Sequence, residues 1–305
     1  MNATSFPVWI DGAVVPADRA TVHVMTPTLH YGWGVYEGVR FYETARGPSA
    51  FRLTAHLRRL RTSARALSME IPYTDDELAR ACRDVVAVSG LSSGYLRPLV
   101  FLAEGAMSVA AQLDHVRVAI GCWSWPSYLG DQEAGIRVRT SGWVRSAPNA
   151  VPPSVKSTGG YVNASLARLD AVRSGAQEAI MLNAAGRVAE ASAANVFIVV
   201  GGELATPPLS EGILPGITRD AVLAMADDLG VSVVERPIAP AELRVASEVM
   251  LAGTAVELTA VAVLDDVPLS ADRPVFDELR ARFDLAVQGG LPGREDWAEA
   301  LTPDA

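Results

Sequence analysis

Hydrophobic and polar residues alternate along this chain with two periods, one typical of strands and the other of helices. Period-two alternation, which places successive side chains on opposite faces, occurs at residues 8–22 and 30–44. In the second stretch, one face carries an acidic residue among apolar ones: Val35, Glu37, Val39 and Phe41. Apolar residues spaced by three and four positions predict a helix from Thr54 onward and another over residues 74–88.

The rest of the chain also interleaves strands with helices. Strands are predicted at residues 96–102, 116–122, 136–143, 178–182, 188–200, 232–235 and 248–251, and helices at residues 160–174, 218–229 and 240–246. Proline, serine and glycine after Trp123 indicate a linker. The sequence thus predicts an α+β protein with a small N-terminal domain (1–125), an interdomain loop (126–135) and a large C-terminal domain (136–305).

Composition narrows the possible partners. The chain has 305 residues, 50% of them hydrophobic and 20% charged, with a net charge of −9, so no general attraction to nucleic acid or to an anionic membrane is expected. No apolar run reaches the roughly 18 residues that a membrane span needs, and residues 1–7 do not resemble a secretory signal. Cys82 and Cys122 lack a C-x-x-C pattern and are expected to be buried, reduced thiols of a cytoplasmic protein. No metal site is expected.

The basic residues are unusual, because 25 of the 26 are arginine and only Lys156 is lysine. A genome-wide drift from lysine to arginine explains such a count at surface positions, where the two residues have similar roles. Drift cannot replace a lysine whose primary amine must lose its proton, since a guanidinium stays charged in proteins. Schiff-base formation with a carbonyl cofactor is the commonest need of that kind. Lys156 is therefore a candidate catalytic residue.

Two stretches are suited to phosphate, although each also has an ordinary structural interpretation. In residues 212–218, a Pro-Gly turn leads into a helix for which Thr218 is the expected N-cap, and free N–H groups at a helix start favour an anion. Residues 253–255 follow a predicted strand and offer a second turn of amides. Glu190 stands among alanines, and a carboxylate in such a place is costly to bury without a cationic partner.

Six motifs occur together in one order along the chain. They are His30-Tyr-Gly-x-Gly-Val-Tyr-Glu-Gly-Val-Arg40, Tyr95-Leu-Arg-Pro98, Val155-Lys156-Ser-Thr-Gly-Gly-Tyr161, Glu190-Ala-Ser-Ala-Ala-Asn195, Ile213-Leu-Pro-Gly-Ile-Thr-Arg219 and Gly253-Thr-Ala-Val-Glu-Leu-Thr259. With this set the chain resembles the class IV aminotransferases, which depend on pyridoxal 5′-phosphate (PLP), and among them the branched-chain amino acid aminotransferases. The resemblance spans nearly the whole chain and implies a two-domain fold type IV enzyme with the cofactor between its domains.

The resemblance also implies how the cofactor is held. Lys156 is expected to form the Schiff base and to shuttle the substrate proton, and Glu190 to bond the pyridine nitrogen so that the ring acts as an electron sink. Tyr161 is expected to donate to the phenolic oxygen of the cofactor. The implied phosphate ligands are Arg59, the amides of Ile217 and Thr218, and the hydroxyl of Thr254.

Substrate contacts follow from the same resemblance. The turn at Thr254 and Ala255, with Tyr95, is expected to receive the α-carboxylate, while Tyr31 and Arg97 meet the γ-carboxylate of glutamate. Tyr31, Tyr36, Trp125 and Tyr128 are the aromatic residues expected to contact an aliphatic side chain. Val109 matches a position that reaches the neighbouring subunit of a homodimer, and higher homo-oligomers stay open. The implied reaction takes L-leucine, L-isoleucine or L-valine with 2-oxoglutarate and gives 2-oxo acids and L-glutamate.

Some positions depart from the branched-chain pattern and keep alternatives open. Tyr36 stands where phenylalanine is usual, Trp33 is larger than the usual residue, and Pro126-Ser127 replaces a Gly-Ala pair. One alternative is therefore an aminotransferase of a specialised pathway that acts on a larger or more polar amino acid. The others are a D-amino acid transaminase, an aminodeoxychorismate lyase, and a non-catalytic binding protein with the same fold.

Overall fold

The computed structural model describes residues 6–105, 107–110, 113–125, 129 and 134–302. Its contacts divide the chain into two compact units: Met1–Pro126 with Val155–Gly159 and Leu285–Ala305, and Ser127–Ser154 with Gly160–Asp284. The domain boundaries predicted from the sequence follow chain order and did not anticipate that residues 155–159 and 285–305 group with the first unit. Most of the interdomain loop predicted at 126–135 lies outside the described residues.

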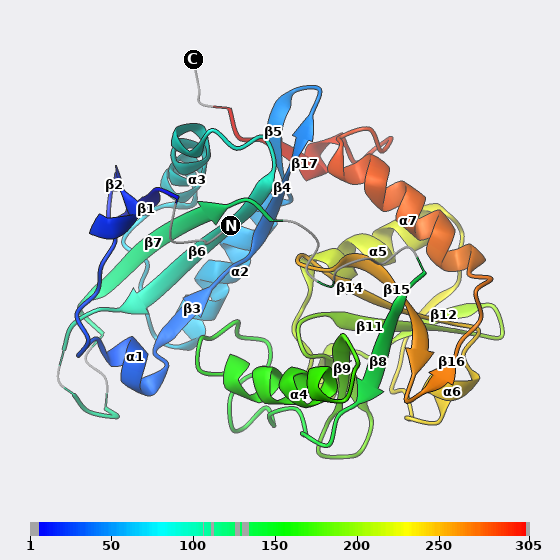
Figure 1. The fold of residues 1–305 in the computed structure, drawn as a ribbon. Coiled ribbons are helices and arrows are strands. Elements are labelled where there is room, and N and C mark those ends of the chain that lie inside the picture. The colour runs from blue at the N-terminus through cyan, green and yellow to red at the C-terminus, as the bar shows by residue number, and fades with distance from the viewer. Residues whose placement is uncertain (1–5, 106, 111–112, 126–128, 130–133, 303–305) are drawn as a thin grey trace. The chain divides into compact units, whose positions relative to one another are not determined.

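The described strands of the first unit form one sheet in the order β17-β5-β4-β6-β7-β1-β2, with β3 also paired to β6 (Figure 1). The strands are β1 (Val8–Ile10), β2 (Ala13–Val15), β3 (Gly34–Tyr36), β4 (Val39–Thr44), β5 (Gly47–Phe51), β6 (Gly94–Leu102), β7 (Val116–Trp123) and β17 (Ala298–Ala300). The helices are η2 (Ala17–Arg19), α1 (Pro27–Tyr31), α2 (Leu53–Ala66), α3 (Asp75–Ser89) and η4 (Glu295–Trp297). All pairings within this sheet are antiparallel.

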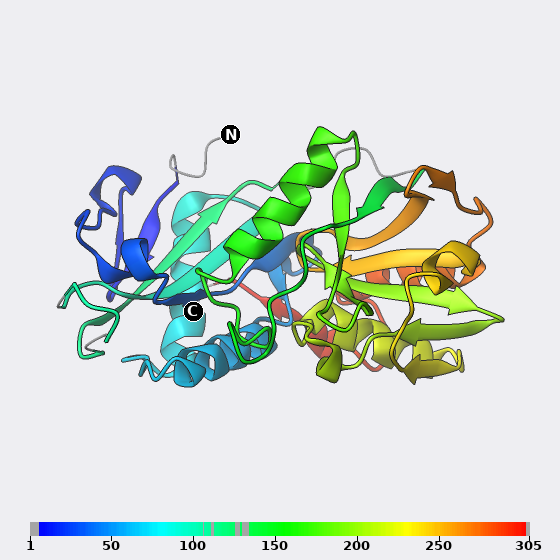
Figure 2. The same ribbon diagram turned by 90° about the horizontal axis from the view of Figure 1, so that it is seen from below.

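Helices α2 and α3 pack on one side of this sheet and share its hydrophobic core (Figure 2). Both were predicted from the apolar spacing, and both are confirmed. The start of α3 is fixed by a capping box in which Thr74 and Glu77 exchange hydrogen bonds, and its end by Gly90 in a left-handed conformation. Local sequence therefore suffices to place this helix.

The alternation predicted over residues 30–44 is interrupted. Helix α1 runs to Tyr31, and Gly32 closes it with a φ of 70°. A Cβ at Gly32 would lie 2.9 Å from the Cα of Gly159, so this position needs glycine for space as well as for conformation. Beyond it, β3 and β4 keep the predicted faces, and the Glu37 side chain is buried with its apolar neighbours.

The described strands of the second unit form a sheet in the order β10-β9-β8-β15-β14-β11-β12-β13, with β16 paired to β15. The strands are β8 (Ile136–Thr140), β9 (Glu178–Leu182), β10 (Val188–Ala191), β11 (Asn195–Val200), β12 (Glu203–Thr206), β13 (Val233–Glu235), β14 (Glu248–Gly253), β15 (Glu257–Leu264) and β16 (Val267–Pro268). The helices are α4 (Tyr161–Arg173), η3 (Leu209–Glu211), α5 (Ile217–Asp228), α6 (Glu242–Val245) and α7 (Pro274–Val287), the last of which continues into the first unit.

In the second unit, α5 and the first part of α7 lie on one side of the sheet and α4 on the other (Figures 1 and 2). Helices α4, α5 and α6 match the predicted ones, whereas α7 was not anticipated. Strand β8 ends at Thr140 rather than at 143 as predicted, because the Ser141 hydroxyl accepts from the Trp143 N–H at 2.9 Å and the chain turns there. Within the part of the chain that the structure describes, no helix has the length and apolar character needed to cross a membrane.

Candidate active site

Lys156 is held in the first unit by hydrogen bonds of its own backbone. Its carbonyl accepts from the N–H of Tyr36 at 3.0 Å, and its N–H donates to the Ser63 hydroxyl of α2 at 3.3 Å. The next residue, Ser157, forms an isolated bridge with Val35 of β3. The side chain then places Nζ 5.0 Å from the centre of the Tyr36 ring. Strand β3 and helix α2 thus hold the backbone of Lys156, the only lysine of the sequence.

An aromatic group surrounds the guanidinium of Arg97 on β6. Its Cζ lies 4.6 Å from the ring centre of Tyr36 and 5.6 Å from those of Tyr95 and Trp123, while Tyr95 stacks on Trp125 at 4.6 Å. Among the described residues, no carboxylate pairs with Arg97, and its buried Nε has no hydrogen-bond partner. An arginine in this setting is suited to an incoming anion.

Four predicted substrate residues therefore lie together with Lys156: Tyr36, Tyr95, Arg97 and Trp125. Gly38 makes room for one of them, because a Cβ at this position would lie only 1.9 Å from the Tyr95 hydroxyl oxygen. Trp123, which completes the ring group, was missed by the sequence analysis. Its place on β7 opposite Tyr95 of β6 follows from strand register, which motif spacing does not reveal.

Arg59 belongs to a buried group with Glu37 and His56. The Glu37 carboxylate accepts from Arg59 Nε at 2.6 Å, from Arg59 Nη2 at 2.8 Å and from His56 Nδ1 at 2.7 Å. Burial alone would raise the pKa of the Glu37 carboxyl, but the charge of Arg59 and the hydrogen bonds from Arg59 and His56 outweigh it and hold the pKa well below its usual range. Burial also lowers the pKa of His56, which favours the neutral ring.

This arrangement fixes the plane of the Arg59 guanidinium through a bidentate contact with Glu37. The sequence analysis selected Arg59 and missed the other two residues. A signal for Glu37 was present, since it is the acidic residue on the apolar face of the 30–44 alternation. His56 and Arg59 lie three positions apart on α2 and so share a face.

Glu190 is the centre of a hydrogen-bonded group in the second unit. It is 4% exposed, and its carboxylate accepts from Arg145 Nη2 at 2.7 Å, from Asn195 Nδ2 at 3.1 Å and from the Leu214 N–H at 3.1 Å. A buried Glu190 was expected to need a cationic partner, and Arg145 is one that the sequence analysis missed. Asn195 Nδ2 also donates to Leu214 O at 3.0 Å, which ties the loop before α5 to Glu190.

The loop leads directly into the start of α5. Gly216 is the N-cap and makes no side-chain cap hydrogen bond, so the prediction that Thr218 is the N-cap was wrong. The helix starts at Ile217, and the extended Gly216 before it lies against Asn195, since a Cβ there would be 2.0 Å from Asn195 Oδ1. Ile217 and the buried Thr218 then form the first turn, where N–H groups favour an anion.

The turn between β14 and β15 carries Thr254 and Ala255, both partly buried. Gly253 brings this turn close to the chain after β10, because a Cβ on it would lie 3.1 Å from Ala193 O and 3.2 Å from the Ala194 Cβ. Glu190, Asn195, the start of α5 and this turn therefore lie at one end of the second-unit sheet.

The structure describes three more of the predicted site residues. Tyr161 is the first residue of α4 and is partly buried. Tyr31 ends α1 with 40% of its surface exposed, and Val109 is 81% exposed in the chain between β6 and β7. Tyr128 lies outside the described residues.

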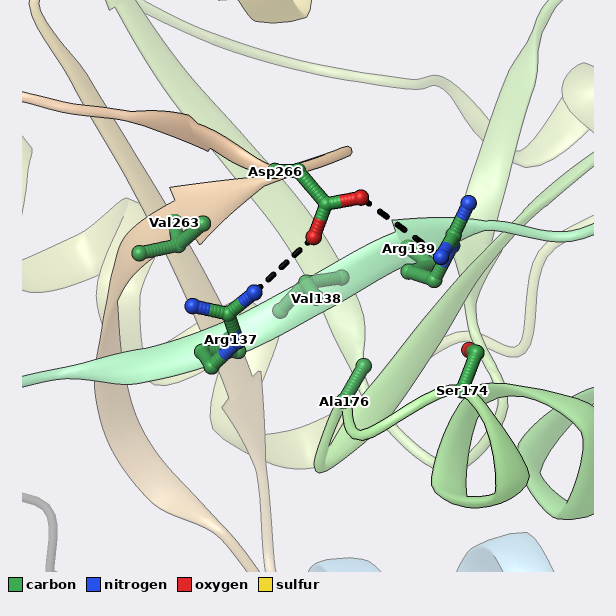
Figure 3. A pocket seen from close by; sticks show the side chains of 7 residues that line it. All are labelled: Arg137, Val138, Arg139, Ser174, Ala176, Val263 and Asp266. Carbon is green, nitrogen blue, oxygen red and sulfur yellow. Dashed lines mark hydrogen bonds and ion pairs between the residues drawn. The ribbon is translucent and has the colours of Figure 1, made fainter.

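The second unit also has an exposed arginine pair, in a depression lined by none of the predicted site residues (Figure 3). Arg137 and Arg139 of β8 both pair with Asp266, at 2.8 Å and 3.6 Å, beside Ser174 and Ala176. Asp266 offsets much of their charge, so this depression is a poor anion site. Within the described ranges, no group of three or more histidine, cysteine or acidic residues is arranged to hold a metal ion.

Comparison with known proteins identifies the family. The model of the amino-transferase class IV family matches residues 34–264. The chain belongs to this family. This confirms the family and the fold type IV architecture that the six motifs implied.

Individual relatives resemble this class IV aminotransferase over nearly their full length. A branched-chain-amino-acid aminotransferase of Pseudomonas aeruginosa is 42% identical over 295 residues, which cover 95% of each chain. The crystal structure of the Escherichia coli branched-chain amino acid aminotransferase matches with a TM-score of 0.95 at 36% identity, covering 98% of this chain and 100% of that one. The branched-chain aminotransferase of T.th. complexed with N-(5′-phosphopyridoxyl)-L-glutamate matches with a TM-score of 0.93 at 38% identity, covering 98% and 99%.

The class IV aminotransferase is a PLP-dependent enzyme, as its family implies. The types of residue found in each unit suit that cofactor. The first unit supplies a primary amine beside an aromatic ring, and the second supplies a buried carboxylate and a helix start with a buried hydroxyl at Thr218. These are the groups that an aldehyde, a pyridine nitrogen and a phosphate require.

Proposed function

We propose that this enzyme transfers the amino group between L-branched-chain amino acids and 2-oxoglutarate. The observation that carries the proposal is Arg97, which has no carboxylate partner among the described residues and is surrounded by Tyr36, Tyr95 and Trp123 near Lys156. Such a site offers apolar surface to an aliphatic side chain and a cation to the γ-carboxylate of glutamate. A transaminase for both substrates needs the two properties together. The names of the relatives support the same substrates.

For the cofactor, we infer that Lys156 Nζ holds PLP covalently and that Glu190 bonds its pyridine nitrogen. Arg59, the amides of Ile217 and Thr218, and the Thr254 hydroxyl would hold the phosphate, while Tyr161 would donate to the phenolic oxygen. The bidentate contact with Glu37 supports this role for Arg59, since it fixes the guanidinium before any ligand arrives. Bound PLP supplies the electron sink that lets the substrate Cα–H bond ionise.

The protein's own part in the chemistry is to orient the substrate and to move one proton. Lys156 Nζ would take the proton from the substrate Cα and hold it until it is returned later in the transfer. Tyr95 and the turn at Thr254 and Ala255 would hold the α-carboxylate, so that the Cα–H bond faces the amine. Stacking of Tyr95 on Trp125 keeps that ring in place.

The side-chain pocket is proposed to have an aliphatic and an ionic part. Tyr31 and Arg97 would meet the γ-carboxylate, and the aromatic residues would contact an aliphatic chain: Tyr31, Tyr36, Trp125 and Tyr128. Because Tyr36 brings a hydroxyl to this pocket, more polar amino acids should be tested as substrates as well. A half-reaction panel, in which the PLP form is mixed with single amino acids, ranks these substrates directly.

We also infer a homodimer. Large apolar side chains that lie exposed around α1 and the chain after β6 support it, since such a patch is costly in water: Val24, Met25, Leu29, Met107 and Val109. Thr28 links the two segments through a hydrogen bond of its hydroxyl to Leu102 O at 2.9 Å. The free, buried thiols of Cys82 and Cys122 support a reducing compartment, which we infer to be the cytoplasm.

The substrate proposal is tested with Arg97→Met. Loss of a charge-assisted contact of about 1.5–3 kcal/mol should raise KM for 2-oxoglutarate about 10- to 150-fold. KM for 2-oxoisocaproate, which has no second carboxylate, should change far less. The matched control is Arg117→Met on the adjacent strand, because Arg117 also stacks on a ring, Phe101 at 5.9 Å, but is paired with Asp11. Equal effects of Arg97→Met on both substrates would contradict the proposal.

A further inference from the structure

Trp123 lies on the same face of the first-unit sheet as Arg97. The opposite face carries the hydrophobic core that α2 and α3 cover, and Leu96 of β6 and Cys122 of β7 belong to that core. Because neighbouring residues of a strand point to opposite faces, Tyr95, Arg97 and Trp123 project from the other face. The residues that β7 places there are partly exposed. Trp123 is therefore outside the core, beside the arginine that is proposed to bind substrate.

Strand register brings the Trp123 ring within reach of Arg97. In the antiparallel pair of β6 and β7, Tyr95 pairs with Trp123 and Arg97 pairs with Gly121. Trp123 is thus a diagonal neighbour of Arg97, at a separation that long and aromatic side chains can bridge. Gly121 leaves the position directly opposite Arg97 without a side chain, and a Cβ there would meet nothing within 4 Å. The Arg97 Cζ lies 5.6 Å from the centre of the Trp123 ring.

The contacts of Arg97 are made with ring faces. Tyr36 lies against the guanidinium at 4.6 Å, and the Trp123 ring is itself supported by Tyr95 at 5.4 Å and by Trp125 at 5.8 Å. Tryptophan gives the strongest cation–π contact of the aromatic residues. Within the described part of the chain, the buried Nε of Arg97 has no hydrogen-bond partner. Ring contacts of this kind restrict where the guanidinium can lie.

Such contacts suit an arginine that has to bind a carboxylate. A guanidinium donates its hydrogen bonds within its own plane, so a ring over its face leaves the N–H groups to a ligand. An arginine side chain has many rotamers, and ordering it when a ligand arrives costs free energy. A ring group that restricts Arg97 beforehand lowers that cost.

We propose that Trp123 is a positioning residue that holds the Arg97 guanidinium ready for the second carboxylate of 2-oxoglutarate. The inference rests on the proposed function in taking Arg97 as the partner of that carboxylate. Loss of the ring should then matter for 2-oxoglutarate and little for an aliphatic 2-oxo acid. A merely structural role, transmitted through Tyr95 or Trp125, would affect both acids alike, because those two residues are proposed to contact every substrate.

The test is the half-reaction of the pyridoxamine phosphate-loaded enzyme with single 2-oxo acids, followed by cofactor absorbance. Trp123→Leu should weaken the apparent affinity for 2-oxoglutarate about 2- to 30-fold, the range of one cation–π contact, and keep the rate at saturation. The affinity for 2-oxoisocaproate should change far less. Trp123→Phe, which keeps a smaller ring, should lie between Trp123→Leu and the wild type.

Two results would overturn the proposal: equal weakening for both acids in Trp123→Leu, or a Trp123→Phe enzyme as weak toward 2-oxoglutarate as Trp123→Leu. If Trp123→Leu does not load the cofactor, Trp123→Phe provides the comparison of the two acids, and equal weakening there has the same meaning.

Trp297→Leu is the matched control. Trp297 belongs to the same unit and also faces arginines, since Arg52 Cζ lies 5.0 Å and Arg294 Cζ 5.3 Å from its ring centre, but it lies in η4. The affinities of this variant for both acids should stay at the wild-type values. A selective loss for 2-oxoglutarate in Trp297→Leu would overturn the proposal, because the loss would then follow from removing any tryptophan that contacts an arginine.

A double substitution tests whether Trp123 acts through Arg97. Added to Arg97→Met, Trp123→Leu should cause little further loss of affinity for 2-oxoglutarate, because the group that it positions is already gone. A further loss as large as in the wild-type background would overturn the proposal.

Arg97→Met alone distinguishes the two levels of the inference. If it weakens both acids equally, the role proposed for Arg97 fails, and the inference about Trp123 fails with it. If Arg97→Met is selective for 2-oxoglutarate but Trp123→Leu is not, only the inference about Trp123 is wrong.

Discussion

Glu37→Gln should destabilise the enzyme although the substitution keeps the shape of the side chain. Glu37 is fully buried and is contacted by Arg59 at 2.6 and 2.8 Å and by His56 at 2.7 Å. Breaking a buried pair by removing one partner costs roughly 3–5 kcal/mol, and we take the lower end because glutamine still offers one acceptor. For a unit of this size, about 3 kcal/mol corresponds to a fall of roughly 6–12 °C in the thermal midpoint.

The dependence on pH identifies the cause. Because the folded-state pKa of Glu37 is lowered, its contribution to stability is present above the unfolded-state pKa and is lost as the pH falls toward the folded-state value. The gap between wild type and Glu37→Gln, measured by thermal denaturation of the apo form, should therefore be widest near neutral pH and narrow below about pH 4.3.

A control for Glu37→Gln is the same substitution at Glu77. Its carboxylate caps the exposed start of α3 through the Thr74 N–H at 2.7 Å, and glutamine can take over that hydrogen bond. Glu77→Gln should change the midpoint little. A Glu37→Gln variant as stable as the wild type, or a gap that does not change with pH, would refute the reasoning.

Three further substitutions test other contacts. Burial raises the pKa of Glu178, so its contribution to stability is present at low pH and is lost as the pH rises. Glu178→Gln should therefore raise the thermal midpoint at alkaline pH and change it little in acid. A rise of the midpoint in acid and none at alkaline pH would contradict this reasoning. Gly38→Ala should displace Tyr95, whose hydroxyl oxygen would lie 1.9 Å from the new Cβ, and raise substrate KM while PLP affinity is kept. Gly216→Ala should lower PLP affinity in a binding titration, because its Cβ would lie 2.0 Å from Asn195 Oδ1; unchanged affinity would contradict this reading.

The sequence predicted those parts of the fold whose causes are local. Helix α3 is an example, since its capping box and its terminal glycine both lie within the segment itself. Helix α7 shows the opposite case. The N–H groups of Val275 and Phe276 in its first turn donate to Glu248 of β14 at 3.1 and 2.8 Å, so this helix start depends on a residue that is distant in the sequence.

The same distinction applies to the candidate site. Lys156 and Glu190 were selected because each stands in a recognisable motif, and Arg59 was selected because the family resemblance implied it. Their partners come from other segments: Glu37 lies 22 positions before Arg59, and Arg145 meets Glu190 across the second unit. Such pairs are set by strand register and by helix packing, and one sequence without a structure does not reveal them.

The central claim is that Lys156 carries the cofactor. The most direct test is borohydride reduction of the PLP-loaded enzyme, followed by intact-mass measurement and peptide mapping. Because Lys156 is the only lysine of the 305 residues, the account predicts one phosphopyridoxyl group per chain, on the peptide that contains Lys156, and none in Lys156→Ala. A reduced adduct elsewhere, or an adduct that persists in Lys156→Ala, would contradict the account.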